Sequence, residues 1–150
     1  MAEPDIDPRR GATADPTAVR REPLVLPFTL DNFVPTRHAV RAYATGTGLS
    51  DMRLYHVVVA VSELMSNAVQ HGGGSGTLRM WADDRRLYCE VADQGPGIPG
   101  GQINGYHLPD PTEVRGRGIW LTRQICDRVD VQTGPSGTTV RVSCTLQEES

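Results

Sequence analysis

The sequence lacks the features that mark several large classes of protein. It holds three cysteines in 150 residues, and none forms a Cys-x-x-Cys pair, so neither a zinc site nor a disulfide framework is indicated. Cys89, Cys126 and Cys144 lie in apolar stretches, and we expect them to be buried free thiols of a protein in the reducing cytoplasm.

Membrane and export signals are also missing. The longest purely apolar run, 57–61, is far shorter than the roughly 20 residues of a membrane-spanning helix. Residues 1–22 contain acids, prolines and arginines but no hydrophobic segment of the kind that directs secretion. These absences predict a cytoplasmic protein that does not contact a membrane.

A strongly basic surface is absent too. The net charge is −3, and arginines are interleaved with acids, which argues against nucleic acid as the main partner. The P-loop pattern G-x-x-x-x-G-K-[ST] does not occur, nor does G-x-G-x-x-G after a strand. The common nucleotide-binding folds are therefore disfavoured.

The length and hydrophobic content of the sequence predict one globular domain. Residues 1–22 show no hydrophobic periodicity, which predicts a disordered N-terminal tail. Residues 23–148 have the length of one compact domain. The hydrophobic fraction of 38% is ordinary for globular proteins.

Two helices are expected in the first half of this domain. One begins near Pro35, because proline suits a first helical turn, and runs to the glycines 46 and 48. The other begins at Ser50 or Asp51, either of which can cap its first turn, and ends at the glycines 72–74. One face of the second helix is apolar: Leu54, Val57, Val58, Val61, Leu64, Met65 and Ala68. The opposite face is polar: Glu63, Ser66, Asn67 and Gln70.

Strands are expected on both sides of these helices. Residues 24–29 predict an edge strand, since Pro27 cannot donate to a ladder. Residues 77–82 and 87–92 alternate in polarity and predict a hairpin around the polar turn 83–86.

The last third of the chain completes the predicted fold. Residues 93–117 are rich in glycine and proline and predict a long functional loop, such as a lid. A third helix is expected over 118–127, then strands over 129–133 and 138–146, of which the last places Val140, Val142, Cys144 and Leu146 on one face. We therefore predict an α+β two-layer sandwich, with helices on one face of a mixed, mostly antiparallel sheet.

The first group of candidate functional residues lies on the second helix. Glu63 and Asn67 are four residues apart, so their side chains share a face. A carboxylate and an amide oxygen together can orient a hydroxyl nucleophile and hold a hard cation such as Mg²⁺. Taken alone, the pair can also be explained as part of the ordinary solvent-exposed face of an amphipathic helix.

Two glycine-containing strings follow. Asp93, Gly95 and Gly97 come directly after a predicted strand, where the carboxylate can accept a bond from an exocyclic amine and the glycines let a base approach the backbone. The alternative is an ordinary glycine-proline turn. The string 116–118, Gly-Arg-Gly, precedes the third helix, whose N-terminus can bind phosphate, or it is simply a helix start.

The order of these motifs along the chain is a more specific signal than any single motif. E-x-x-x-N on a helix, D-x-G-x-G after a hairpin, G-x-G before a helix, and Gly-Thr-Thr at 137–139 together resemble the Bergerat ATP-binding fold of the GHKL superfamily, over about residues 23–146. The resemblance implies a histidine-kinase-like ATP-binding domain over 23–148 that uses ATP and Mg²⁺.

The resemblance also implies a role for each matching residue. Glu63 is the general base, and Asn67 is the Mg²⁺ ligand. The remaining nucleotide contacts that the resemblance implies are Asp93 on the adenine amino group, Gly95, Gly97 and Ile98 around the base, Gly116, Arg117 and Gly118 on the phosphates, and Thr138, or alternatively Thr139, in support of the adenine contact.

The wording of two motifs suggests a subfamily. S-E-L-x-x-N-A-V-x-H-G-G-G and G-R-G-x-W-L-x-R-Q-x-C-D resemble the actinobacterial anti-sigma factor serine/threonine kinases. That resemblance implies a transcription regulator that phosphorylates a serine of a small anti-anti-sigma (STAS-type) partner and holds a sigma factor. Formation of a homodimer stays open.

Two alternatives remain at the level of sequence. The chain could be a non-catalytic module in which ATP orders a loop and displays a protein-binding surface. It could also be the ATP-binding half of a split histidine kinase, although residues 1–50 offer only His38 as a phosphoacceptor and no room for a helical hairpin. Gyrase or mismatch-repair roles would need additional domains.

Overall fold

Five strands form one sheet in the order β1-β2-β3-β5-β4. The structure is a computed structural model that describes residues 22–97 and 121–146. The strands are β1 (Leu24–Thr29), β2 (Ser75–Ala82), β3 (Arg86–Asp93), β4 (Arg128–Gly134) and β5 (Gly137–Thr145). All four pairings between neighbours are antiparallel, so the described strands contain none of the parallel pairing expected of a mixed sheet.

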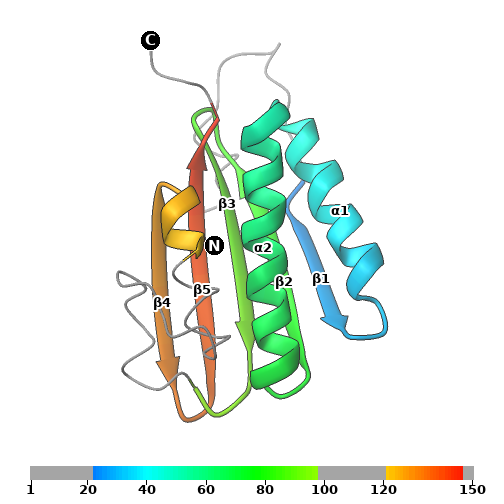
Figure 1. Ribbon diagram of the computed structural model, residues 1–150, viewed down its shortest axis with the longest axis vertical. Coiled ribbons are helices and arrows are strands. Elements are labelled where there is room, and N and C mark those ends of the chain that lie inside the picture. The colour runs from blue at the N-terminus through cyan, green and yellow to red at the C-terminus, as the bar shows by residue number, and fades with distance from the viewer. Residues whose placement is uncertain (1–21, 98–120, 147–150) are drawn as a thin grey trace, which may run out of the picture.

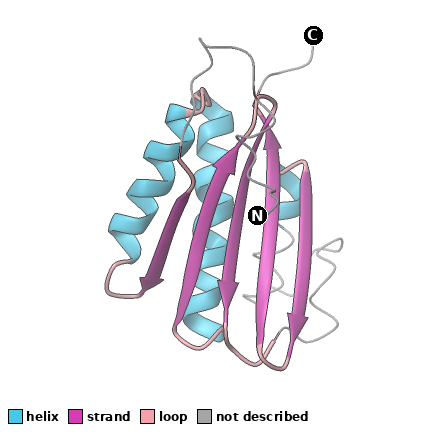
Figure 2. Ribbon diagram, turned by 180° about the vertical axis from the view of Figure 1, so that it is seen from behind, coloured by secondary structure: helices cyan, strands magenta, loops and turns pink. Residues whose placement is uncertain are grey.

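Helices cover one face of this sheet. Helix α1 (Phe33–Gly46) and helix α2 (Asp51–His71) lie side by side in front of it. A short helical segment, 121–125, lies in front of β4 and β5 (Figure 1). Figure 2 shows the sheet from behind, with no described helix over that face. The predicted α+β two-layer sandwich is confirmed.

The ends of α1 and α2 differ from the sequence predictions in detail. Helix α1 begins at Phe33, two residues before Pro35. The reason is Asn32, whose side chain accepts from Thr29 N at 2.7 Å and donates to Pro27 O at 3.1 Å, so the chain turns directly from β1 into the helix. Ser50 is the N-cap of α2, but its side chain makes no capping hydrogen bond.

The strands match their predicted positions to within two residues at each end, and β5 ends at Thr145, one residue before the predicted end at Leu146. Pro27 lies on β1 at the edge of the sheet, as expected of a residue without an N–H donor. The described part of the predicted third helix is 121–125, and its expected start at Gly118 lies outside the described residues. The predicted tail falls outside them as well, apart from Glu22.

The core lies between the helices and the sheet. Six of the seven residues predicted for the apolar face of α2 are buried, and Val58 is half-buried: the six are Leu54, Val57, Val61, Leu64, Met65 and Ala68. They meet the inward side chains of the strands, including Leu78, Met80, Leu87, Val91, Val140 and Val142. Each such side chain contributes roughly 1.5–3 kcal/mol on burial.

The three cysteines belong to this core. Cys89, Cys126 and Cys144 are buried and free, as predicted from their apolar surroundings. Burial raises the pKa of the Cys89 thiol. A hydrogen bond between Cys126 and Cys144 shifts the pKa values of those two thiols in opposite directions, raising that of Cys126 and lowering that of Cys144. Within the described residues, no helix has the length and apolarity needed to cross a membrane.

Candidate functional site

Three segments that are far apart in the sequence meet at one end of the molecule. They are the C-terminus of α2, the loop after β3 and the turn between β4 and β5. A Cβ atom built at Gly72 would lie under 3.0 Å from Asp93 Oδ2, and one at Gly95 would lie equally close to Gly72 Cα. Real Cβ atoms essentially never come so close. Glycine is therefore required where α2 passes the loop.

The β4–β5 turn approaches the same loop. A Cβ at Gly137 would overlap the carbonyl oxygen of Asp93, and one at Gly97 would lie 2.6 Å from Gly134 O. Gly137 and Gly97 also have positive φ values of 147° and 95°, a region that other residues rarely adopt. Backbone atoms of the turn and of the loop therefore lie in close contact at these glycines.

Asp93 is held in one orientation at the centre of this arrangement. Its half-buried carboxylate accepts the backbone N–H of Gly95 at 2.9 Å and of Thr138 at 3.2 Å, both on Oδ1. Among the described residues, Oδ2 receives no hydrogen bond. Since an ionised carboxylate is acceptor-only, the fixed group offers Oδ2 to a donor such as an exocyclic amine.

Thr138 and Thr133 support Asp93 from the sheet. Thr138 is buried, with 5% of its surface exposed. Its hydroxyl oxygen lies 2.8 Å from that of Thr133, its partner across the β4–β5 hairpin. This hydrogen bond ties the two strands together beside the carboxylate.

Glu63 and Asn67 lie in the C-terminal half of α2, the helix that ends at this arrangement. Both are half-buried, one helical turn apart. Asn67 lies five residues before Gly72, about 7.5 Å along the helix axis. Its Oδ1 atom is buried and has no hydrogen-bond partner. Leaving a buried acceptor unsatisfied costs about 1–3 kcal/mol, and such an exception in a folded protein calls for a functional explanation.

The amide oxygen of Asn67 could be one ligand of a divalent cation whose other ligands do not come from the protein. Amide and carboxylate oxygens are ligands for Mg²⁺, which usually retains waters and substrate phosphates in its shell. In residues 22–97 and 121–146, no group of three or more His, Cys, Asp or Glu side chains could hold a metal. A cation at Asn67 would therefore need ligands from a bound phosphate and from water.

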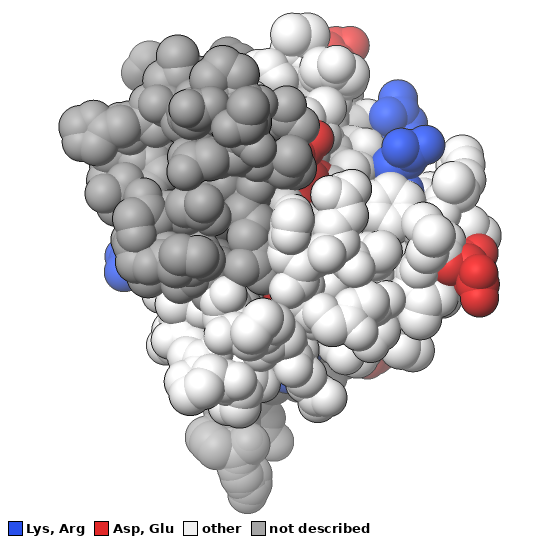
Figure 3. Space-filling model, turned by 60° about the horizontal axis from the view of Figure 1, so that its bottom comes forward, with Lys and Arg blue, Asp and Glu red and all other residues white. Residues whose placement is uncertain are grey.

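The described surface at this end carries few charged side chains. Figure 3 brings the bottom of the molecule forward, and most of the described surface there is neither basic nor acidic. The predicted phosphate contacts Gly116, Arg117 and Gly118, together with Ile98, lie outside the described residues.

Three residues of this arrangement were not predicted as site residues. Gly72 and Gly137 lie within the quoted motifs but have no role in the site predicted from them, and Thr133 was predicted only as part of a strand. The hairpin register, which opposes Thr133 to Thr138, would have pointed to the threonine pair. Their closeness to Asp93 depends on contacts between distant segments, which the local pattern does not contain.

Comparison with known proteins connects this geometry to a family. A family model described as a histidine kinase-like ATPase domain matches residues 26–144, from β1 to β5. The serine-protein kinase RsbW of Bacillus licheniformis is 30% identical over 126 residues, which cover 75% of this chain and 78% of that protein.

Two further similarities involve longer proteins. The sensor histidine kinase YxdK of Bacillus subtilis is 32% identical over 100 residues, or 56% of this chain and 31% of that protein. The structure of the RsbU and RsbW domains of Rv1364c from Mycobacterium tuberculosis superposes with a TM-score of 0.65 at 17% identity, covering 87% of this chain and 34% of that one. This chain thus spans about a third of each of these two relatives.

The match to the family model covers most of the chain and every strand of the sheet. It includes the helix that carries Glu63 and Asn67, the strand β3 that ends at Asp93, and the hairpin that carries Thr138. The RsbW relative agrees over a similar share of the sequence. The chain belongs to the histidine kinase-like ATPase domain family.

Proposed function

We propose that this chain is an ATP-dependent protein serine kinase of the anti-sigma factor type. In this proposal it phosphorylates a serine of a small anti-anti-sigma partner and holds a sigma factor according to its nucleotide state. The observation that carries the proposal is the placement of Glu63 and Asn67 one turn apart on the helix that ends against Asp93. The RsbW relative, named a serine-protein kinase, supports the same class of reaction.

Asp93 and its neighbours would bind the adenine base. The two backbone N–H groups on Oδ1 hold the carboxylate in place, and Oδ2 would accept a hydrogen from the exocyclic amine. Gly95 and Gly97 have no side chains to obstruct the base. The hydroxyl of Thr138, fixed by Thr133, would lie beside this contact.

Asn67 and Glu63 would serve the transfer step. Mg²⁺ held through Asn67 Oδ1 would neutralise charge on the phosphates. Glu63 would take the proton from the serine hydroxyl as the new oxygen–phosphorus bond forms and the bond to ADP breaks. The products are phosphoserine, ADP and a proton, and catalysis would rest mainly on positioning and charge stabilisation. The phosphate contacts of Gly116, Arg117 and Gly118 and the base contact of Ile98 stay predictions.

A kinase assay with the Glu63→Gln variant tests the proposal. The purified chain, Mg-ATP and an anti-anti-sigma protein from the same genome are incubated, and phosphoserine is measured by mass spectrometry. We expect transfer by the wild type and a loss of about 10²–10⁴-fold in the variant, which lacks the base, while calorimetry finds ATP affinity unchanged.

Two outcomes would redirect the proposal. ATP binding without transfer to any such partner would favour the ATP-gated binding module. Phosphate on a histidine of a second protein would favour the split histidine kinase. His38, considered above as a phosphoacceptor, is an exposed residue of α1.

A further inference from the structure

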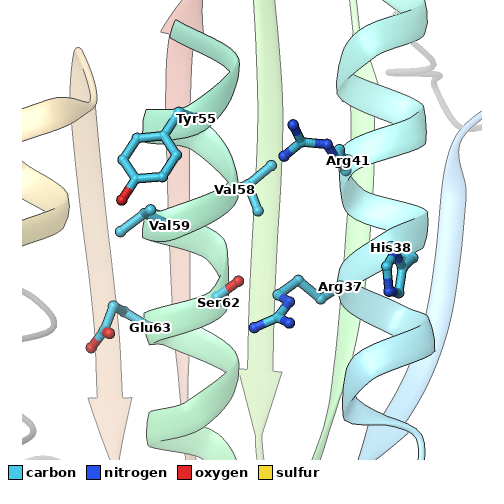
Figure 4. Close-up of a pocket in the computed structure, with 8 residues that line it drawn as sticks. All are labelled: Arg37, His38, Arg41, Tyr55, Val58, Val59, Ser62 and Glu63. Carbon is cyan, nitrogen blue, oxygen red and sulfur yellow. The ribbon is translucent and has the colours of Figure 1, made fainter. Parts of the chain in front are cut away.

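A groove with a volume of about 520 Å³ lies between α1 and α2. Of its lining residues on α2, Val58 also packs against the core, whereas Tyr55, Val59, Ser62 and Glu63 do not belong to the buried face of the helix, so the groove opens on the outer side of the helical layer. Its lining shares no residue with the glycine contacts around Asp93. Figure 4 shows the residues that line it.

The wall formed by α1 is cationic. Arg37 and Arg41 are exposed and one helical turn apart, and both side chains point from α1 toward α2 (Figure 4). Ion pairs between described residues form at Arg128–Asp130 and Arg141–Glu90, and neither groove arginine takes part in one. Like charges at this spacing repel each other by a few tenths of a kcal/mol, so an anion between them would relieve an existing strain.

The wall formed by α2 is largely apolar. Tyr55 is 57% exposed, and the half-buried Val58 and Val59 continue the surface next to it. Ser62 lies one helical turn after Val58 and also lines the groove. Its hydroxyl group is buried and has no hydrogen-bond partner. Exposed tyrosine and arginine around an apolar floor are the composition of protein-binding hot spots.

The groove also reaches the proposed reaction site. Glu63 is one of its lining residues and lies with Tyr55 and Val59, at successive turns of α2, along the margin of the groove that is farther from α1 (Figure 4). A chain segment lying in the groove would therefore pass next to the carboxylate to which we assign the proton transfer.

We propose that this groove binds an acidic segment of a protein partner. Carboxylates of that segment would pair with Arg37 and Arg41, and its apolar side chains would cover Val58 and Tyr55. The net charge of −3 disfavours a nucleic acid or an anionic lipid surface, and neither would use the apolar wall. The inference deepens the proposed function by giving its partner a docking surface, but it does not require phosphoryl transfer.

A photo-cross-linking experiment with charge exchange tests the groove. Tyr55 is replaced by benzoylphenylalanine in the full chain, cross-linked in native lysate, and the captured segment is identified by mass spectrometry. The affinity of the purified partner is then measured for Arg37→Glu and Arg41→Glu. We expect an acidic segment and about tenfold weaker binding for each variant, restored to within about threefold when the facing acid is changed to lysine.

The matched control is Arg79→Glu. Arg79 is exposed on β2 between two inward-facing residues, so it lies on the opposite face of the sheet. Binding of the partner should change by less than about twofold in this variant. ATP affinity and melting temperature are measured for all three variants and should remain at wild-type values.

Several results would overturn the docking proposal. These are no cross-link, a cross-link to nucleic acid, lipid or a segment without acids, or partner affinity that neither arginine variant changes. Loss of ATP binding or transfer with partner binding intact would contradict the proposed function alone. If Arg37→Glu and Arg41→Glu bind the partner with wild-type affinity and still phosphorylate it, only the docking surface would be contradicted.

Discussion

At the scale of single residues, the site depends on one carboxylate and on glycines that make room for it. Two backbone N–H groups fix Oδ1 of Asp93. Gly72, Gly95 and Gly137 each stand where a Cβ would overlap a neighbouring segment. The side chain that we assign to base recognition is therefore positioned by main-chain atoms, and both kinds of residue can be tested separately.

Asp93→Asn should weaken ATP binding by about 2 kcal/mol, or roughly thirtyfold, because the amide can keep the bonds on Oδ1 only by presenting a donor to the adenine amine. Stability should change little. Titration calorimetry measures the affinity, and Asp83→Asn is the control. Asp83 also accepts two backbone N–H groups, from Arg85 and Arg86 at 2.8 Å each, but at the far end of β3. Equal affinity in the two variants would remove Asp93 from the base contact.

Gly72→Ala should lower both the free energy of unfolding and the affinity for ATP. The new methyl group would overlap Asp93 Oδ2 and force the loop away from α2, at a cost of about 1–3 kcal/mol. Urea unfolding measures the stability. Gly134→Ala is the control, since nothing lies within 4 Å of its Cβ position and its φ is not positive. If Gly72→Ala lowers the free energy of unfolding no more than Gly134→Ala does, Gly72 does not lie as close to Asp93 as described.

Residue identities near the site were predictable to different degrees. Asp93 and Thr138 were predicted by resemblance, and the structure brings them into direct contact, while their roles toward a nucleotide stay predictions. Gly72, Gly137 and Thr133 were not predicted as site residues because a glycine run and a strand threonine have ordinary local explanations. Only the arrangement of strands reveals what they touch.

At the scale of elements, α2 combines a core-forming face with a polar one. Its apolar face was predictable from the period of the sequence, and the burial of Leu54, Val61 and Met65 confirms it. Its first turn was predicted less well, because the side chain of Ser50 makes no cap and Asp51 has a positive φ of 56°. Helix ends depend on how the preceding loop is held by tertiary contacts, whereas helix faces depend mainly on hydrophobic spacing.

Asn67→Ala should separate binding from folding on this helix. Because Oδ1 is buried without a partner, its removal should lower the stability of the nucleotide-free protein by no more than about 0.5 kcal/mol. Mg²⁺-dependent affinity for ATP should fall by about tenfold or more, as expected for loss of a cation ligand. Gln70→Ala, on the exposed part of the same helix where Gln70 donates to Ser66, is the control. If the affinity for ATP depends neither on Mg²⁺ nor on the Asn67→Ala change, Asn67 is not a Mg²⁺ ligand.

At the scale of the whole molecule, the core joins helices and sheet through side chains that include three cysteines. The fold class followed from the succession of helical and alternating segments. The strand order did not, because the neighbours of β5 are set by packing over the entire sheet. The large segment between Gly97 and residue 121 lies outside the described residues, so the predicted phosphate contacts remain predictions.

The buried Cys89 predicts how the stability of the whole domain depends on pH. Its pKa is raised in the folded state by burial, whereas an unfolded cysteine titrates near about 8.5. The folded state thus keeps a proton that the unfolded chain loses, and the free energy of unfolding should fall as pH rises above that value, by at most about 1.4 kcal/mol per pH unit for this thiol.

Urea unfolding between pH 7 and pH 10 measures this dependence. Cys89→Ala should have a shallower slope than the wild type, although the change also removes packing and lowers stability at every pH. A wild-type stability that stays constant up to pH 10 would contradict the prediction. The slope that remains in Cys89→Ala would come from other groups whose pKa is raised in the folded state, which include Cys126 and, through its desolvation, Tyr88.

The strand order has a consequence for synthesis of the protein. Strand β5 is made after β4 but pairs between β3 and β4, and it supplies the Thr138 N–H group that holds Asp93. While β5 is still inside the ribosome, β3 and β4 have no strand to join them, and the aspartate lacks one of its two donors. A nascent chain therefore cannot assemble this site until β5 has emerged, and a product truncated before Gly137 would lack it.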